Sequence, residues 1–151
     1  MHEMRVRPSR PSDYDFLWWL HQATMKEYVD KTWGWDGDVQ ARAFQHAFET
    51  DHEGLQIIEY TGERIGYIRV VAEPSRLFLA AIELAPSHQR RGIGTALIED
   101  VCGRADSMEL PVELHVLKVN PAKHLYERLG FVTQGETETH YLMRRGKNGA
   151  V

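Results

Sequence analysis

Apolar residues near the N-terminus change from an alternating to a helical spacing. Residues 4–8 alternate apolar and charged side chains, which predicts a short strand. From Phe16 to Tyr28 the spacing is mostly helical. Ser12 and the acidic residues that follow it favour a helix that begins at Asp13, with Ser12 as its cap. We therefore expect a strand followed by a helix.

A second helix is expected at about residues 38–49, after the glycine-containing segment 32–38. Its apolar residues share one face at i, i+3 and i+7: Ala41, Phe44 and Phe48. Three strand-like segments follow, separated by short turns, at 54–60, 64–72 and 77–85. Three consecutive antiparallel strands are the simplest arrangement for them.

The second half of the chain alternates strands and helices. A helical pattern at 92–105 and a strand-like segment at 111–119 follow strand 77–85, which predicts a crossover between two parallel strands. A further helix follows, with Asn120 as its cap, Pro121 in its first position and Gly130 at its end. Segments 131–135 and 139–144 predict a closing hairpin. The order predicts an α+β fold, a mixed sheet with helices on both faces.

Composition limits the classes of protein that need considering. Of 151 residues, 42% are hydrophobic and 26% are charged, which suits one core, so we expect a single domain over 1–146 and a mobile tail over 147–151. The formal charge of −4 argues against generic nucleic-acid binding. The longest apolar run, Leu77–Ile82, is too short for a signal peptide or membrane span. A single cysteine allows no internal disulfide, and a cytoplasmic location is the default expectation.

The segment from His88 to Thr95 carries the strongest chemical signal. It lies where an apolar strand passes into a helix, whose first N–H groups are unpaired and carry partial positive charge. Gly92 and Gly94 leave those N–H groups accessible, and neighbouring arginines add positive potential. This chemistry favours a pyrophosphate. The alternative is that the glycines only permit a tight turn. Neither a P-loop nor a complete dinucleotide fingerprint is present.

Two motifs resemble those of the GNAT acetyltransferase superfamily. Gln89-Arg90-Arg91-Gly92-Ile93-Gly94 matches its Q/R-x-x-G-x-G/A loop, and the segment Asn120–Phe131 matches N-x-x-A-x-x-L-Y-x-x-x-G-F. The resemblance covers residues 77–143 well and the first third only by element order. It implies a mostly antiparallel seven-stranded sheet in which the parallel strands 77–85 and 111–119 splay apart. It also implies acetyl-CoA as the donor.

The resemblance assigns candidate donor-binding residues across both motifs. The pantetheine arm would pair with main chain near Glu83 and Leu84, and the pyrophosphate would lie on the glycine loop. The full set of candidates is Leu84, Gln89, Arg90, Arg91, Gly92, Ile93, Gly94, Thr95, Asn120 and Tyr126. Helix capping alone also explains Asn120.

Acyl transfer to an amine needs an acid for the thiolate and a route for the amine proton. Tyr126 matches the family position whose hydroxyl faces the sulfur, although it also continues the apolar stripe of its helix. Glu83 interrupts an apolar strand, and burial would raise its pKa toward neutrality, as suits a base. The alternative is an ion pair with a nearby arginine. His115 and His140 are weaker candidates for a base, and a water chain needs no side-chain base at all.

Cysteine and metal chemistry have little support in the sequence. Cys102 lies on the helix after the glycine loop, without a paired histidine motif, so a packed thiol is expected rather than an acetyl-cysteine intermediate. The eight histidines show no metal-ligand spacing. No metal is predicted.

The acceptor side of the family lies over the variable helices between the first two strands. Here aromatic and acidic residues interleave, and both attract an ammonium group. The hypothesis is that segment 32–38 forms a lid that selects a cationic amine, with candidates Glu27, Tyr28, Trp33 and Trp35. The alternative is that the tryptophans fill the core and the acids cap helices.

The function expected from the resemblance is an N-acetyltransferase that acts by direct transfer in a ternary complex. The acceptor would be a primary amine of a small molecule or peptide. The alternative is a non-catalytic acyl-CoA-binding sensor or interaction domain. The sequence leaves open whether a homodimer forms.

Overall fold

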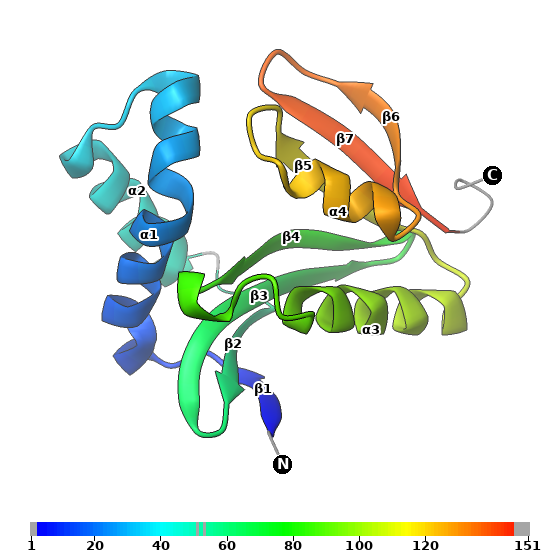
Figure 1. Ribbon diagram of the computed structural model, residues 1–151, viewed down its shortest axis with the longest axis horizontal. Helices are drawn as coiled ribbons and strands as arrows, with labels where there is room; N and C mark the ends of the chain where they lie inside the picture. The colour runs from blue at the N-terminus through cyan, green and yellow to red at the C-terminus, as the bar shows by residue number, and fades with distance from the viewer. Residues whose placement is uncertain (1–2, 51, 53, 147–151) are drawn as a thin grey trace. The chain divides into compact units, whose positions relative to one another are not determined.

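Seven strands form one sheet in the computed structural model, in the order β1-β2-β3-β4-β5-β7-β6 (Figure 1). The structure describes residues 3–50, 52 and 54–146, so the predicted tail at 147–151 lies outside the described residues. The strands are β1 (Met4–Pro8), β2 (Leu55–Tyr60), β3 (Glu63–Glu73), β4 (Arg76–Leu84), β5 (Val112–Leu117), β6 (Val132–Glu136) and β7 (His140–Arg145).

Helices connect the strands in the predicted order. They are α1 (Tyr14–Trp33), α2 (Gly37–Thr50), α3 (Ile93–Ser107) and α4 (Ala122–Arg128), with short 3-10 helices η1 (Pro11–Asp13) and η2 (Pro86–His88). The predicted element order and the mostly antiparallel mixed sheet are confirmed, with β4 and β5 as its parallel pair.

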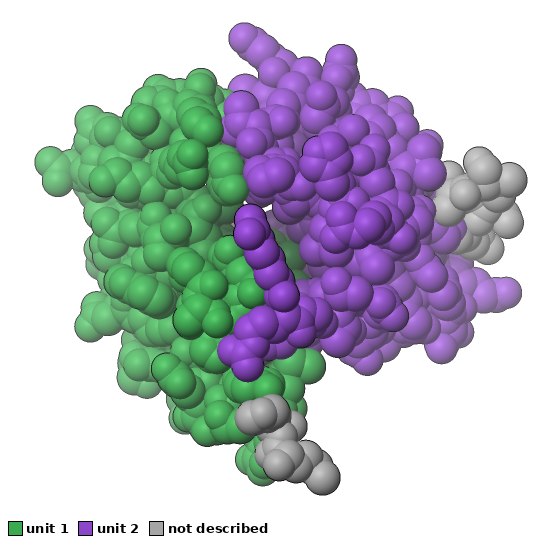
Figure 2. Space-filling view, in the orientation of Figure 1, with its two compact units in different colours: residues 1–69, 81–89 green, residues 70–80, 90–151 purple. Residues whose placement is uncertain are grey.

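The chain divides into two compact units, coloured separately in Figure 2. The first comprises residues 1–69 and 81–89. Its core joins α1 to β2, β3 and the residue after β4 through Leu17, Leu20, Ile57, Tyr67 and Ala85. Phe44 and Phe48 of α2 pack against this core, as the predicted stripe requires.

The second unit comprises residues 70–80 and 90–151. Its parallel ladder has three register pairs, which begin at Leu77–Val112 and end at Leu79–Leu114. The rest of β5 pairs with β7, which in turn pairs with β6 in the predicted hairpin. Helix α3 contacts β5 and buries one face, with Leu97, Ile98, Val101 and Ala105 among its buried residues. The packing of α3 on β5 thus fixes the position of this helix within the second unit.

The predicted cap of the first helix is wrong. Asp13, not Ser12, organises the turn, because its carboxylate accepts the backbone N–H of Arg10 at 2.8 Å. The same carboxylate is 1% exposed and binds the guanidinium groups of Arg7 and Arg64. Residues 11–13 therefore form η1, and α1 begins one residue later than predicted, at Tyr14.

The segment predicted to separate the first two helices is mostly helical. Only residues 34–36 connect α1 to α2. Gly34 ends α1 with a φ of 86°, and its N–H donates to the carbonyl of Asp30. The carboxylate of Asp36 accepts the backbone N–H groups of Asp38 and Val39 at the start of α2. Residues 32–38 therefore comprise two helix ends and a three-residue connection, and their role as a lid stays a prediction.

Candidate functional site

The glycine loop of the second unit has an unusual backbone at the start of α3. Gly92 has a φ of 81° and Arg90 a φ of 60°, so two left-handed residues lie within one turn. A side chain at Gly92 would meet no atom within 4 Å, so the space in front of it is open. Helix α3 follows at Ile93, and the N–H groups of its first turn have no intrahelical acceptor. This geometry fits a diphosphate.

Gln89 and Leu84 belong to the first unit and contact each other. The Gln89 Nε2 donates to the Leu84 carbonyl at 2.9 Å, which ties the residue after η2 back to the end of β4. The Leu84 carbonyl therefore already has a donor from its own chain. Arg90 and Arg91 are exposed in the second unit. Binding of a donor by these residues stays a prediction.

Asn120 precedes α4, and Tyr126 lies within it. The Asn120 Oδ1 accepts the Ala122 N–H at 2.9 Å, as a capping side chain does, but the helix begins at Ala122, and Pro121, expected in the first position, is its N-cap. The Tyr126 ring is 8% exposed and packs edge-on against Phe131, with centroids 5.7 Å apart. The packing role of Tyr126 is therefore confirmed, and its acid role stays a prediction.

Glu83 is held by two hydroxyl groups of the first unit. Its side chain is 9% exposed. The Tyr67 hydroxyl donates to Oε2 at 2.6 Å, and the Thr24 hydroxyl lies 2.5 Å from Oε1. The alternative expectation of an arginine partner is wrong, because no described arginine pairs with this carboxylate. Glu83 is thus a largely buried carboxylate that is held by neutral donors.

The Tyr67 hydroxyl is a permanent donor in this network. Burial, and then the charge and hydrogen bond of Glu83, raise the pKa of Tyr67 well above its ordinary value. Tyr67 therefore remains neutral, and its single hydrogen stays available to Oε2. The Thr24 hydroxyl has two acceptors in reach, Oε1 of Glu83 and the Leu20 carbonyl at 3.0 Å. Thr24 can therefore turn its one hydrogen from Oε1 to Leu20 when Glu83 carries a proton.

His21, Thr24 and Tyr67 are the residues that the sequence analysis missed. The His21 Nδ1 lies 3.5 Å from the Glu83 Oε2. His21 and Thr24 occupy the i+4 and i+7 positions from the buried Leu17, on the stripe of α1 that faces the core. The sequence does show these two polar side chains on a core-facing stripe, but it does not identify Glu83 as their partner.

The four candidate acceptor residues have different surroundings. Trp33 is 60% exposed. The exposed Glu27 pairs with Lys31, and Tyr28 is partly buried one position further along α1. The Trp35 ring stacks on Trp18 at 6.1 Å, and the Lys26 ammonium lies over it at 5.8 Å. Asp36 accepts backbone N–H groups at the start of α2, as the capping alternative predicts, and Asp30 accepts the Trp35 N–H after the end of α1. Trp33 thus presents the most exposed aromatic surface of the four.

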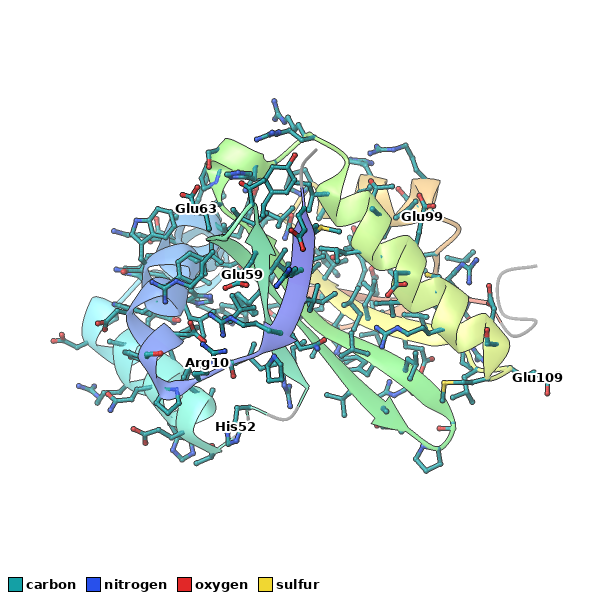
Figure 3. All side chains as sticks on the ribbon, turned by 90° about the horizontal axis from the view of Figure 1, so that it is seen from below. Arg10, His52, Glu59, Glu63, Glu99 and Glu109 are labelled. Carbon is teal, nitrogen blue, oxygen red and sulfur yellow. The ribbon has the colours of Figure 1, made fainter. Side chains whose placement is uncertain are left out.

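Among the cavities that the described residues form, two are lined by residues of the first unit. One of about 410 Å³ has Arg10 and His52, both labelled in Figure 3, in its wall, together with Tyr14 and Phe48. The other, of about 300 Å³, includes the labelled Glu63 with Trp19 and His88. None of the predicted catalytic or donor-binding side chains lines either cavity.

The remaining titratable candidates occupy structural positions. The His140 Nδ1 lies 2.8 Å from the Thr139 hydroxyl, and burial, with a smaller contribution from His115, lowers the pKa of His140. His115 is exposed beside Phe78. Burial raises the pKa of the Cys102 thiol, which disfavours the reactive thiolate. No group of three or more His, Cys, Asp or Glu residues suited to a metal occurs among the described residues.

Membrane-spanning helices were also searched for. In the part of the chain that the structure describes, no helix combines the length and the apolar character that crossing a bilayer requires.

Comparison with protein families decides the class of this chain. Residues 10–131 match the model of the acetyltransferase (GNAT) family. The chain belongs to the GNAT acetyltransferase family. It is therefore an acyltransferase, and the match includes the glycine loop and all of α4. A comparison with curated protein sequences finds no match.

Solved structures share the GNAT fold at low sequence identity. The PaiA N-acetyltransferase from Thermoplasma acidophilum, in complex with coenzyme A, is 12% identical with a TM-score of 0.75, over 95% of this chain and 99% of that one. An acetyltransferase from Thermus thermophilus is 20% identical with a TM-score of 0.73, over 97% and 99%. An Arabidopsis thaliana protein in complex with the bisubstrate analogue CoA-Ac-MVNAL is 16% identical with a TM-score of 0.64, over 95% and 98%. These similarities concern the fold.

Proposed function

We propose that this GNAT protein is an N-acetyltransferase that moves the acetyl group of acetyl-CoA directly to a primary amine of a small molecule or peptide. The reaction converts an ammonium group and a thioester into an amide, a thiol and one released proton. The observation that carries the proposal is the start of α3, where Arg90 and Gly92 are left-handed, a side chain at Gly92 would meet no atom within 4 Å, and the first N–H groups have no intrahelical acceptor. Coenzyme A in the Thermoplasma acidophilum complex supports the same donor.

The proposed donor contacts follow from the chemistry of a diphosphate. The N–H groups of Ile93, Gly94 and Thr95 supply hydrogen bonds at the positive end of the α3 dipole, and Arg90 and Arg91 supply charge. When bound, acetyl-CoA supplies an electrophilic acyl carbon and a thiolate leaving group. The chain's own task is to fix the diphosphate, so that the thioester is held in one orientation.

Glu83 is proposed to accept the proton of the acceptor ammonium. Its burial keeps bulk water from competing for that proton, and the hydroxyl of Tyr67 keeps Oε2 in place. Thr24 supports both protonation states, because its hydrogen turns from Oε1 to the Leu20 carbonyl. A carboxylate whose partners are neutral donors can accept a proton without breaking an ion pair, and this supports the base role over a structural one.

Tyr126 is proposed to donate a proton to the departing thiolate. A phenol is a suitable acid for a thiolate, and the packing of the ring against Phe131 restricts its rotation. The acceptor is proposed to approach Glu27, Tyr28, Trp33 and Trp35. Trp33 offers an exposed aromatic face, and Glu27 offers a carboxylate, to a cationic amine.

The donor loop is tested by two substitutions that differ only in charge. Asn and Asp are nearly isosteric, and both tolerate a left-handed conformation, so Gly92→Asn is the matched control for Gly92→Asp. We expect Gly92→Asp to weaken CoA binding by at least about tenfold more than Gly92→Asn, because a carboxylate would face the diphosphate. Isothermal titration calorimetry measures both affinities. Equal affinities in two folded variants would show that the diphosphate lies elsewhere.

A further inference from the structure

An imidazole of α1 lies against the carboxylate of Glu83 without a hydrogen bond. The His21 Nδ1 is buried and makes no hydrogen bond among the described residues. It lies 3.5 Å from the Glu83 Oε2, within ion-pair distance but beyond ordinary hydrogen-bond length. The His21 side chain as a whole is 19% exposed. A buried polar atom usually has a hydrogen-bond partner, so an Nδ1 that faces a carboxylate without one calls for an explanation other than stability.

Three uncharged rings surround His21. Phe44 of α2 stacks on it at 4.9 Å, and Trp18 and Trp35 lie at 6.2 Å and 6.4 Å. Titratable groups come from β4 and β3: Glu83, and Tyr67, which its raised pKa keeps neutral. From α1, Thr24 contributes a neutral hydroxyl, and the Lys26 ammonium lies over the Trp35 ring. The rings restrict the imidazole and leave the Glu83 carboxylate as the charged group in contact with it.

The position of the Nδ1 proton follows from this contact. An unprotonated Nδ1 would direct its lone pair at a carboxylate oxygen, and two acceptors facing each other repel. A protonated Nδ1 is attracted to Oε2 in either the neutral or the cationic ring. With Tyr67 and His21 both directed at Oε2, the lone pairs of that oxygen are occupied, and Oε1 is left to receive a proton.

We propose that His21 is a positioning residue for Glu83: its Nδ1–H closes onto Oε2 and leaves Oε1 to take the acceptor proton. This deepens the proposed function and rests on it. Catalytic hydrogen bonds are often long before substrate binds, which accounts for the present 3.5 Å separation.

Two variants test the Nδ1–H donor. His21→Asn keeps an N–H donor near the position of Nδ1, and His21→Leu removes it. Above neutral pH, we expect His21→Leu to lower kcat about tenfold with the acceptor KM within about twofold, and His21→Asn to recover most of the loss. His46→Asn, at an exposed histidine of α2, should keep the wild-type kcat and acceptor KM.

A readout that does not depend on activity completes the test. The ¹⁵N shift of the His21 Nδ1, assigned by its loss in His21→Asn, should lie in the protonated range at neutral pH. An unprotonated Nδ1, a wild-type kcat in His21→Leu, or a kcat in His21→Asn as low as that of His21→Leu each overturns the role of His21. Failure of wild-type protein to acetylate any amine overturns the proposed function and this role with it, whereas an active wild type with an equally active His21→Leu overturns the role alone.

Discussion

Asp13 carries a buried charge whose removal has a calculable cost. Its carboxylate is 1% exposed and accepts hydrogen bonds from Arg7 at 2.9 and 3.0 Å and from Arg64 at 3.2 Å. These contacts tie β1 and β3 to the start of α1, the helix that carries His21 and Thr24. In Asp13→Asn, two guanidinium groups would face a neutral amide. We therefore expect the first unit to be destabilised.

The magnitude follows from the shifted pKa of Asp13. The hydrogen bonds from Arg7, opposed by burial and aided by Arg10 and Arg64, lower that pKa from 3.8 to about 2. The difference of about 1.8 pH units corresponds to about 2.5 kcal/mol at 1.36 kcal/mol per unit. The unfolded chain binds the proton first as pH falls. The stabilisation is therefore complete above about pH 4 and is lost as pH falls through about 2.

Tryptophan fluorescence is a suitable assay, because all four tryptophans, at positions 18, 19, 33 and 35, lie in the first unit. Denaturant unfolding should give Asp13→Asn a free energy of unfolding about 2.5 kcal/mol below wild type at neutral pH, and the difference should shrink toward zero near pH 2. Asp15→Asn, at an exposed position of α1, is the control and should change stability by less than about 0.5 kcal/mol. A difference between Asp13→Asn and wild type that stays constant with pH would refute the linkage.

Two further substitutions test how the fold supports Glu83 and Tyr126. A Cβ at Gly66 would overlap the Glu83 carbonyl and lie 2.8 Å from the Leu84 Cδ2, so Gly66→Ala should cost about 1–3 kcal/mol of unfolding free energy and lower kcat. Gly103→Ala, where a Cβ would meet no atom within 4 Å, should neither lower the stability nor lower kcat. Equal free energies of unfolding for Gly66→Ala and Gly103→Ala would contradict the packing argument. Tyr126→Phe keeps the ring and removes the proton, so steady-state kinetics and calorimetry should show kcat about 100-fold lower with nearly unchanged CoA affinity. An unaltered turnover number would remove Tyr126 from the chemistry.

Local patterns in the sequence predicted most elements, because each element has its own hydrophobic period. The stripe with Phe44 and Phe48 found α2, and the crossover between β4 and β5 followed from one helical pattern between two strands. Predicted element boundaries were wrong where a side chain contacts an element that is distant in the sequence. Asp13 binds Arg64 of β3, and no local rule ranks that ion cluster above capping by Ser12.

Local sequence patterns could not predict the residues around Glu83 for the same reason. Thr24 and Tyr67 lie 59 and 16 residues from it in sequence, and only the packing of α1 and β3 against β4 brings their hydroxyls to one carboxylate. The motif-bearing residues behave differently. Gly92 has a left-handed conformation within the loop motif, and the Asn120 side chain accepts the Ala122 N–H at the start of α4, where its sequence position predicted a capping contact.

Acetyl transfer itself is the property to measure first. The protein should be mixed with acetyl-CoA and a panel of arylalkylamines, polyamines, amino acids, aminoglycosides and peptide N-termini, and both free thiol and acetylated amine should be quantified by mass spectrometry. We expect at least one amine to be acetylated with saturation, with one thiol released per amide formed. Tight CoA binding without acetylation of any amine would contradict the enzyme and favour a sensor that binds acyl-CoA.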